Sequence, residues 1–400
     1  MTAAATIRLE TTKRLTAAQE YALVSAAYAR APSPGPVRER LAWLNNRQET
    51  FAETVALLDG AAALNFREAL MLTSALLAAD DEAATERALE TGRQAFDLAE
   101  TDTARAAALT EVGRAQARLR RPHARATLAR ALELDPHNGD AFRRLAGLHT
   151  AEGDCGAVMT LTERLLARGV GHSELFAVRV VALARLGEVA AARDLAGFQQ
   201  FHQQRKLAAP PSWASADDYH AALAAELLAH PGLYLQRNYG GAGPPTWRID
   251  TVASRAAPLA VGLLERLIPE IGRHLEAAAS GSDHPWLRTR PRELVLHGWC
   301  VITEEDGFET WHIHEAGWLS GVYYVSVPAT VADAADERGQ IAFGLPEELV
   351  GEAVARDFGR AVVRPEPGLL VLFPAHTYHR TFPHRSTARR TCISFDLWPG

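Results

Sequence analysis

The sequence predicts a two-domain protein of the α+β class, with an all-α N-terminal array and a C-terminal antiparallel β barrel or jelly roll with flanking helices. Two contrasting halves of the 400-residue chain support this prediction. Residues 15–200 are rich in alanine, leucine, arginine and glutamate with helical apolar spacing, whereas short apolar segments separated by glycines and prolines follow residue 293. We expect a helical repeat domain at 1–205, a linker at 206–214 and a β domain at 215–400.

The N-terminal half contains a repeat of 34 residues. Three pairs of identical residues have this separation, namely Leu132 and Leu166, Phe142 and Phe176, and Gly153 and Gly187. The turn at 131–138 and the helix that follows it have the form of a tetratricopeptide unit, and Gly113 and Gly147 extend the period upstream. This period is typical of paired antiparallel helices that bury their apolar faces by stacking on their neighbours. An irregular helical bundle without true repeats is the alternative.

The elements of the C-terminal half follow from local signals. Adjacent prolines at 210 and 211 cannot continue a helix, so they place the linker at 206–214. Apolar spacing predicts two amphipathic helices, at 217–230 and 257–279. Short apolar segments bounded by glycine, proline and charged residues predict five strands, at 294–302, 319–327, 340–343, 368–373 and 390–397. Short strands of this kind are typical of an antiparallel barrel or jelly roll.

Composition excludes several classes of protein. The net charge of −6 and the pI near 6.2 argue against a nucleic-acid binder. The apolar runs are too short to cross a membrane. Three distant cysteines, Cys155, Cys300 and Cys392, fit neither a disulfide framework nor a zinc cluster. We expect a cytoplasmic protein, whose oligomeric state stays open and includes a homodimer.

The segment His312-Ile-His314 carries the sharpest functional signal. Residues two apart on an extended strand share a face, so these two imidazoles can reach one metal ion. A third histidine, His379, follows the apolar strand at 368–373, and Arg390 opens the next strand. Neighbouring histidines on one strand, a distant histidine and a later basic residue fit a non-haem iron site with open coordination positions.

Alternation gives the last strand one polar face, formed by Arg390, Cys392, Ser394 and Asp396. A buried arginine on such a face suits a small carboxylate, because a guanidinium grips a carboxylate with two parallel hydrogen bonds. Ser394 and one tyrosine of the pair Tyr323 and Tyr324 are candidates for further bonds to the same molecule. Strand parity does not decide between the tyrosines, each of which can also be core packing, and we take Tyr323 as the candidate.

Residues 215–400 resemble the bacterial 2-oxoglutarate/iron(II) oxygenases that often follow tetratricopeptide repeats. The resemblance is carried by ordered motifs at 298–299, 307, 312–314, 318–325, 367–374, 379–383 and 390–396. It implies a double-stranded β-helix that uses iron(II), 2-oxoglutarate and dioxygen. It also implies that His312 and His379 bind iron and that Arg390 binds 2-oxoglutarate.

Most of these oxygenases have Asp or Glu where this chain has His314. Three ligand sets are open. In the first, His314 completes a neutral set of three histidines. In the second, Glu315 or another carboxylate binds, and in the third a vacancy beside His312 and His379 is filled by water or an anion. We favour three histidines, because the shared face of His312 and His314 requires no backbone distortion.

We therefore expect an oxidoreductase, an iron(II)- and 2-oxoglutarate-dependent dioxygenase that hydroxylates a peptide or protein side chain through ferryl hydrogen abstraction. The helical repeats would recruit the substrate or a partner. Trp311 and Trp318, which flank the metal segment, are candidates for a substrate cleft or for barrel packing. Hydroxylation or halogenation of a small molecule is one alternative function. A non-catalytic metal-binding interaction protein is another, although a structural metal site has no need of Arg390.

Overall fold

The computed structural model describes residues 6–11, 15, 17–79, 81–197, 200–236, 245–280 and 282–400. The chain forms two compact units, which are described separately. One unit is helical and spans Leu15–Leu161. The other combines Met1–Arg14 with Thr162–Gly400 and contains both β-sheets.

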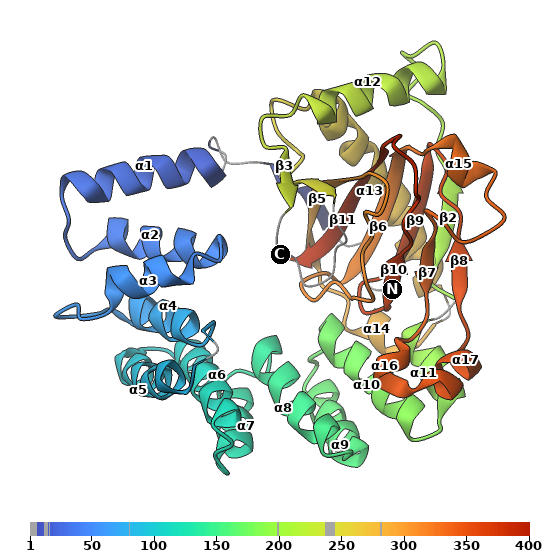
Figure 1. Ribbon diagram of the computed structural model, residues 1–400. Helices are drawn as coiled ribbons and strands as arrows, with labels where there is room; N and C mark the ends of the chain where they lie inside the picture. The colour runs from blue at the N-terminus through green and yellow to red at the C-terminus, as the bar shows by residue number, and fades with distance from the viewer. Residues whose placement is uncertain are drawn as a thin grey trace. The chain divides into compact units, whose positions relative to one another are not determined.

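The helical unit consists of helices that follow one another along the chain, coloured blue to teal in Figure 1. They are α1 (Ala17–Arg30), α2 (Pro36–Arg47), α3 (Phe51–Leu58), α4 (Phe66–Leu76), α5 (Glu82–Leu98), α6 (Asp102–Arg118), α7 (Ala124–Leu134), α8 (Gly139–Ala151) and the first part of α9 (Cys155–Ala167). Side chains cap several first turns. Asn65 and Glu68 form a capping box at α4, and Thr101 accepts a hydrogen bond from the backbone N–H of Ala104 at α6. Local sequence therefore sets where these helices begin.

The helical prediction for the N-terminal half is confirmed. Phe142 and Phe176 are both fully buried, and Gly153 and Gly187 both follow a helix with positive φ angles of 76° and 82°. Glycine is favoured at such a position because the residue that ends the helix is left-handed, and glycine has no Cβ that would clash in this conformation. These matched positions agree with a 34-residue period, whereas the assignment of tetratricopeptide repeats stays a prediction.

Gly113 and Gly147 share this period but differ in their surroundings. A Cβ at Gly113 would lie 2.6 Å from Cγ of the buried Leu128, whereas nothing lies within 4 Å of a Cβ at Gly147. We expect Gly113→Ala to destabilise the protein by about 1–3 kcal/mol through overpacking. Gly147→Ala, the matched control, is expected to be neutral or to stabilise α8 by up to about 1 kcal/mol. Denaturant unfolding measures both, and equal effects would contradict the difference in packing.

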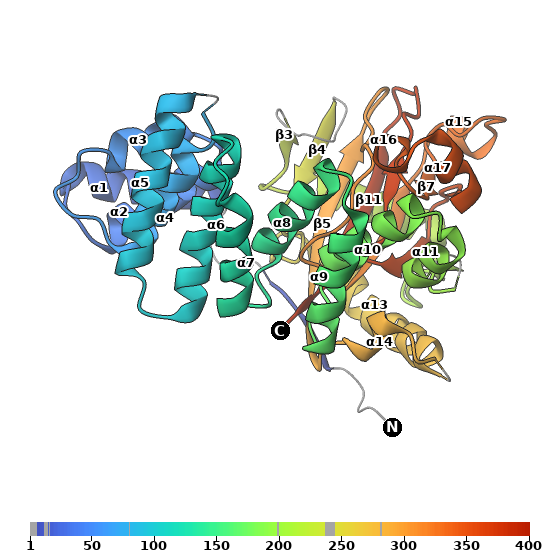
Figure 2. The ribbon, with the colours of Figure 1, turned by 90° about the horizontal axis from the view of Figure 1, so that it is seen from below.

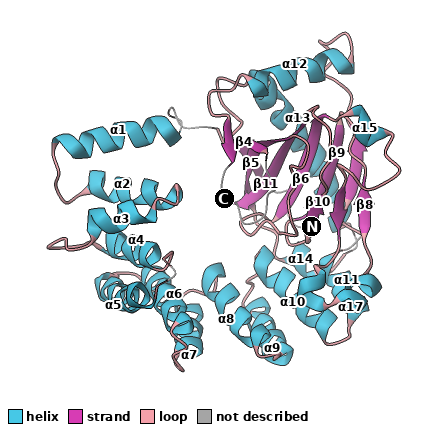
Figure 3. Cartoon of the chain, viewed as in Figure 1, coloured by secondary structure: helices cyan, strands magenta, loops and turns pink. Residues whose placement is uncertain are grey.

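The second unit contains a large and a small sheet, drawn in magenta in Figure 3. The large sheet has the order β2-β9-β6-β11-β5-β4-β3 with β1 added parallel to β5, and the small sheet has the order β10-β7-β8. The strands are β1 (Thr6–Leu9), β2 (Gln203–Lys206), β3 (Tyr234–Gln236), β4 (Thr246–Ile249), β5 (Glu293–Thr303), β6 (Leu319–Ser326), β7 (Ile341–Phe343), β8 (Ala361–Val363), β9 (Leu369–Pro374), β10 (His379–Thr381) and β11 (Arg390–Pro399). The five predicted strands are confirmed as β5, β6, β7, β9 and β11.

Helices cover the sheets of this unit. They are α10 (Ser173–Arg185), α11 (Val189–Ala196), α12 (Ala216–Leu228), α13 (Pro258–Ala279), α14 (Pro285–Arg288), α15 (Ala329–Ala332), α16 (Glu347–Val350) and α17 (Glu352–Phe358). Leu264 of α13 packs where Gly298 of β5 leaves room, so α13 lies on the outer face of the large sheet. The helices α16 and α17 lie beside α10 and α11, which come much earlier in the chain (Figure 2). None of the helices in the described ranges is both long and apolar enough to span a bilayer.

The compact units divide the chain upstream of the predicted linker at 206–214. The strand β2 pairs with β9, with Gln203 opposite Leu372, and α10 and α11 pack on α16 and α17. Residues 162–206 therefore belong to the unit that contains the sheets. Their helical, polar sequence resembles the N-terminal half, which is why composition places the boundary later.

Candidate metal centre

His312 and His379 lie opposite each other on two antiparallel segments. The backbone N–H of each donates to the carbonyl oxygen of the other, at 3.0 Å in both directions. His379 begins β10, whereas His312 forms only this isolated bridge, and His314 N–H donates to Ala375 O at 3.0 Å. The sequence predicted that His312 and His314 lie within a strand. In the structure they lie in a segment beside β10 that forms only an isolated bridge.

Backbone carbonyls orient two of the imidazoles. His312 Nδ1 lies 2.8 Å from Thr310 O, and His379 Nδ1 lies 3.0 Å from Thr377 O. Because a carbonyl can only accept, Nδ1 carries the hydrogen in both rings and Nε2 keeps its lone pair. Each segment thus holds its own histidine in a tautomer that can bind a metal through Nε2.

A carboxylate orients the third imidazole. His314 Nδ1 lies 2.6 Å from Asp396 Oδ1 and 2.9 Å from Ser320 Oγ, and the Ser320 hydroxyl donates to the same carboxylate oxygen at 2.6 Å. His314 Nδ1–H therefore donates to Asp396, and Nε2 is the nitrogen left for a metal. Burial opposes protonation of His314, but the charge and hydrogen bond of Asp396, together with the charge of Glu309, raise its pKa above the usual value.

The three imidazoles converge on one point. One ring nitrogen from each of His312, His314 and His379 lies within 4.8 Å of the other two. Burial lowers the pKa of His379 well below its usual range, and the neighbouring His312 and His314 lower it further. Burial also lowers the pKa of His312. His312 and His379 are therefore neutral near pH 7, and the donor set fits a divalent transition metal such as iron(II).

A cavity of about 40 Å³ adjoins the histidines, and strand register decides which side chains line it. Cys392 and Ser394 of β11 face into it with the residues opposite them, Tyr324 of β6 and Trp299 of β5. Directly opposed residues of neighbouring antiparallel strands share a face of the sheet. The cavity is thus built on the polar face that alternation predicts for β11, which begins with Arg390.

Arg390 is 3% exposed and has unused hydrogen-bonding capacity at this cavity. One terminal nitrogen donates to Gly339 O at 3.0 Å, while Nε has no partner among the described residues. A buried donor without an acceptor is costly, so this position favours a bound anion. A carboxylate fits, because the guanidinium edge offers two parallel N–H donors.

A family model covers the segment that holds this site. Residues 297–396, which include all three histidines and Arg390, match the family described as "Putative 2OG-Fe(II) oxygenase". This segment is a 2OG-Fe(II) oxygenase domain. Its cofactors are iron(II) and 2-oxoglutarate, and the protein is an oxidoreductase.

Solved structures similar to the oxygenase domain and its surroundings include a prolyl-4-hydroxylase from Pseudomonas putida. It is 17% identical with a TM-score of 0.34, over 54% of this chain and 99% of that chain. A 2OG-Fe(II) oxygenase family oxidoreductase from Burkholderia pseudomallei is 13% identical with a TM-score of 0.32, over 54% and 91% of the two chains. A Trichoplax adhaerens prolyl hydroxylase, solved with a hypoxia inducible factor peptide fragment, is 12% identical with a TM-score of 0.32, over 55% and 91%. No curated protein sequence matches this chain.

Tyr324, and not Tyr323, faces the cavity of the oxygenase domain. Tyr323 lies opposite Ile393 on the other face of the sheet, where its hydroxyl is 2.8 Å from His220 Nε2. Tyr324 lies opposite Cys392, and its hydroxyl forms no hydrogen bond with any residue in the described ranges. Tyr324 therefore replaces Tyr323 as the candidate for contact with 2-oxoglutarate. Alternation along β6 alone could not select it, since the face depends on the register with β11.

We expect Tyr324→Phe to raise the KM for 2-oxoglutarate about fivefold, the effect of losing one hydrogen bond of about 1 kcal/mol. Tyr323→Phe is the matched control, because it removes the hydroxyl that contacts His220 and should change stability without changing this KM. Steady-state kinetics and thermal unfolding of both variants provide the measurement. An unchanged KM in Tyr324→Phe would remove this hydroxyl from the co-substrate site.

Trp318 belongs to the core of the oxygenase domain. It is 4% exposed and stacks on Trp286, with ring centroids 4.3 Å apart and an interplanar angle of 11°. Each indole N–H also donates to the backbone carbonyl of the other tryptophan, at 3.0 and 3.3 Å. The prediction that Trp318 lines a substrate cleft is therefore wrong, and packing is its role.

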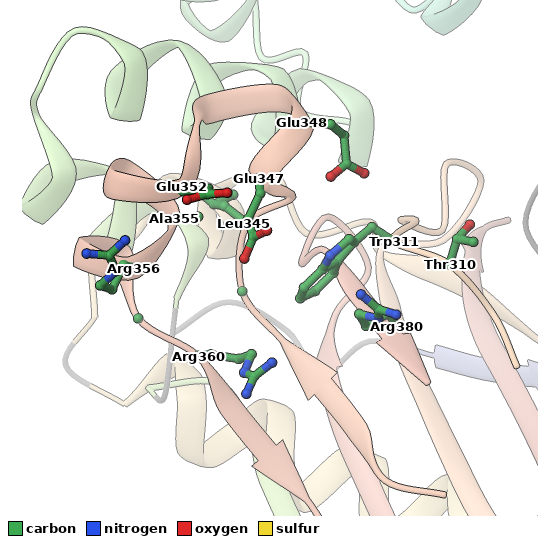
Figure 4. A pocket seen from close by; sticks show the side chains of 12 residues that line it. Thr310, Trp311, Leu345, Glu347, Glu348, Glu352, Ala355, Arg356, Arg360 and Arg380 are labelled. Atoms are coloured by element: carbon green, nitrogen blue, oxygen red, sulfur yellow. The ribbon is translucent and has the colours of Figure 1, made fainter. Parts of the chain in front are cut away.

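Trp311 lines a second pocket of about 620 Å³ (Figure 4). The charged side chains around it are Glu347, Glu348, Glu352, Arg356, Arg360 and Arg380. Figure 4 shows Trp311 and Arg380 on one side and the glutamates on the helices opposite. Because Arg380 follows His379 on β10, the two side chains point to opposite faces of the small sheet. The pocket therefore flanks the metal cavity without opening into it through β10.

Sequence reasoning missed two carboxylates beside the histidines. Asp396 was placed on the correct strand face, but its contact with His314 depends on a loop that alternation does not describe. Glu309 Oε2 lies 3.4 Å from His312 Nε2, and Glu309 also lines the cavity. Its position three residues before His312 was the available signal. Glu315, the alternative ligand, is exposed and lies outside the group of three histidines.

Proposed function

We propose that this oxygenase hydroxylates a side chain of a peptide or protein, with iron(II) held by His312, His314 and His379 and 2-oxoglutarate held by Arg390. One observation carries the proposal. Three imidazoles whose Nδ1 atoms are already hydrogen-bonded each place a ring nitrogen within 4.8 Å of the other two, next to a buried guanidinium with an unpartnered nitrogen. When bound, iron(II) and 2-oxoglutarate supply the oxidising chemistry directed at a C–H bond.

Arg390 is the proposed anchor for the distal carboxylate of 2-oxoglutarate. Its bond to Gly339 O fixes the guanidinium, so little side-chain entropy is lost when the carboxylate binds. Tyr324 and Ser394 lie on the same lining and can donate to the same molecule. Apolar side chains, among them Phe373, complete the wall of the cavity and exclude water. Exclusion of water strengthens the attraction between the Arg390 guanidinium and the carboxylate of 2-oxoglutarate.

The three histidines form a neutral ligand set. A carboxylate ligand would cancel one unit of the metal's charge, whereas imidazoles leave both units in place. Without a charged direct ligand the metal would keep more positive charge for the dianionic 2-oxoglutarate, and Asp396 offsets part of that charge through His314.

The pocket beside Trp311 supports a peptide substrate. Charges of both signs line it, and none of Glu347, Glu348 and Glu352 forms an ion pair with a residue in the described ranges. A peptide with acidic and basic side chains can pair with both walls. Thr310 and Trp311 lead from this pocket to His312, whose side chain is 31% exposed. Paired helices of the helical unit are suited to hold a longer extended segment.

Succinate release by the iron-loaded full-length protein tests this function. We expect slow release from 2-oxoglutarate alone and faster release with a library of peptides that carry acidic and basic residues. Stimulation by small molecules only would contradict the peptide assignment. The absence of any succinate from iron-loaded protein would contradict the proposed chemistry.

Trp311→Ala separates substrate binding from cofactor binding. We expect it to raise the KM for a stimulating peptide about tenfold or more, since a buried aromatic contact is often worth 2 kcal/mol or so. The rate without peptide should not change, because Trp311 lines the pocket and not the metal cavity. An unchanged peptide KM would exclude this pocket as the docking site.

A further inference from the structure

Asp396 is a buried carboxylate that no lysine or arginine in the described ranges balances. It is 6% exposed, and its Oδ1 accepts hydrogen bonds from His314 Nδ1 and from Ser320 Oγ, both at 2.6 Å. No arginine or lysine within the described parts of the chain forms an ion pair with it. Burying a carboxylate costs free energy unless hydrogen bonds and a nearby positive charge compensate. The hydrogen bonds are present, and the positive charge is not supplied by a lysine or arginine.

The position of Asp396 is fixed by the sheet. On β11 it lies opposite Ser320 of β6, so the two side chains share a face and meet. Ser320 is fully buried and directs its hydroxyl at the carboxylate. His314 completes the group from the adjoining loop, where its Nδ1 contacts the carboxylate, and one of its ring nitrogens lies within 4.8 Å of a ring nitrogen of each of the other two histidines. The carboxylate is thus connected to the metal position by one imidazole ring.

We infer that Asp396 supplies, through His314, the negative charge that the metal centre lacks among its direct ligands. When a carboxylate accepts a hydrogen bond from Nδ1–H of a ligating histidine, Nε2 donates its electron pair to the metal more strongly. The hydrogen bond also holds the ring in place. The metal ion in turn provides the positive charge that the buried Asp396 requires. The Asp396–His314 pair therefore takes over the function of the carboxylate ligand that most such oxygenases have at position 314. This inference rests on the proposed three-histidine site, and Asp396 is a positioning residue within it.

Glu309 does not replace Asp396 in this role. Its carboxylate lies 3.4 Å from His312 Nε2, but the side chain is 27% exposed, so solvent screens its charge. It also makes no hydrogen bond to the Nδ1 of a proposed ligand, since His312 Nδ1 is bound by Thr310 O.

Two substitutions at these positions should have effects that depend on each other. Asp396→Asn keeps the size of the side chain and an oxygen that can accept from Ser320 and His314, but removes the charge. We expect it to weaken metal affinity about 10- to 100-fold. His314→Asp creates a direct carboxylate ligand but sets it beside Asp396, so two like charges face each other. In that background the imidazole that joins Asp396 to the metal is gone, so Asp396→Asn should weaken metal affinity much less than it does in the wild type.

The experiment measures cobalt(II) and iron(II) affinity of the full-length protein under anaerobic conditions, for the wild type, both single variants and the double variant. Asp357→Asn, an exposed site with the same change in charge, is the control and should leave affinity unchanged. Thermal unfolding of the metal-free proteins checks that each variant folds. Loss of most of the Asp396→Asn effect in the His314→Asp background supports the inference.

Two other outcomes are distinguishable. If Asp396→Asn has no effect on a wild-type protein that binds metal, or weakens binding equally in both backgrounds, the inference is overturned while the proposed function stands. If the wild-type protein binds neither metal, the proposed metal site itself fails.

Discussion

Replacing His379 by alanine is expected to weaken iron(II) binding by more than about 100-fold and to abolish the release of succinate from 2-oxoglutarate. Removal of a group that only orients a ligand typically costs 10- to 100-fold in metal affinity, and removal of a ligand should cost more. His379 is 4% exposed, and its ring nitrogen is one of only three that converge in the described part of the chain. Anaerobic titration with iron(II) measures the affinity, and succinate quantification measures the activity.

His137→Ala is the matched control for this variant, because His137 is exposed and lies in the helical unit. It should leave iron affinity and succinate release unchanged. Circular dichroism shows whether His379→Ala keeps the fold. A folded His379→Ala protein with wild-type iron affinity would remove this histidine from the ligand set.

Replacing Arg390 by alanine is expected to raise the KM for 2-oxoglutarate by about 100-fold, with iron affinity retained. Two charge-assisted hydrogen bonds of about 1.5 kcal/mol each correspond to a factor of this size. The guanidinium of Arg390 lines the cavity but forms no hydrogen bond with any of the three histidines. The Arg390→Ala variant should therefore keep its metal site. Anaerobic titration of iron-loaded protein with 2-oxoglutarate, followed by visible absorption, measures the change directly.

Arg389→Ala is the matched control, since the neighbouring Arg389 is exposed and pairs with Glu304 at 2.6 Å. Its removal should leave the 2-oxoglutarate titration unchanged. Arg390→Lys should recover only part of the affinity, because an ammonium cannot form the two parallel bonds of a guanidinium. An absorption titration of Arg390→Ala that matches the wild type would overturn the assignment of this residue.

Local patterns predicted the elements that carry the site. Alternation in 390–397 identified the polar face of β11, and apolar runs bounded by glycine and proline identified β5, β6, β7 and β9. The strands β1 and β2 were missed because each has only four residues, and β2 has no apolar residue at all. They join the large sheet at β5 and β9 through backbone pairing, which depends little on side-chain type.

The errors within the site have a shared physical cause. The choice between Tyr323 and Tyr324 depends on which residue of β11 lies opposite, and the register between these strands shifts between Thr391 and Cys392. The contact of Asp396 with His314 likewise joins residues far apart in the sequence. Register and loop path are tertiary properties, and no pattern within a single strand determines them.

A crystal structure of the oxygen-free protein with iron(II) and 2-oxoglutarate tests the central claim most directly, with data collected at the iron absorption edge. The account predicts an anomalous peak bonded to Nε2 of His312, His314 and His379, and a distal carboxylate of 2-oxoglutarate paired with Arg390. A metal that lacks a bond to one of these three nitrogens, for example because Glu309 takes its place, would contradict the account. A co-substrate carboxylate that lies away from Arg390 would also contradict it.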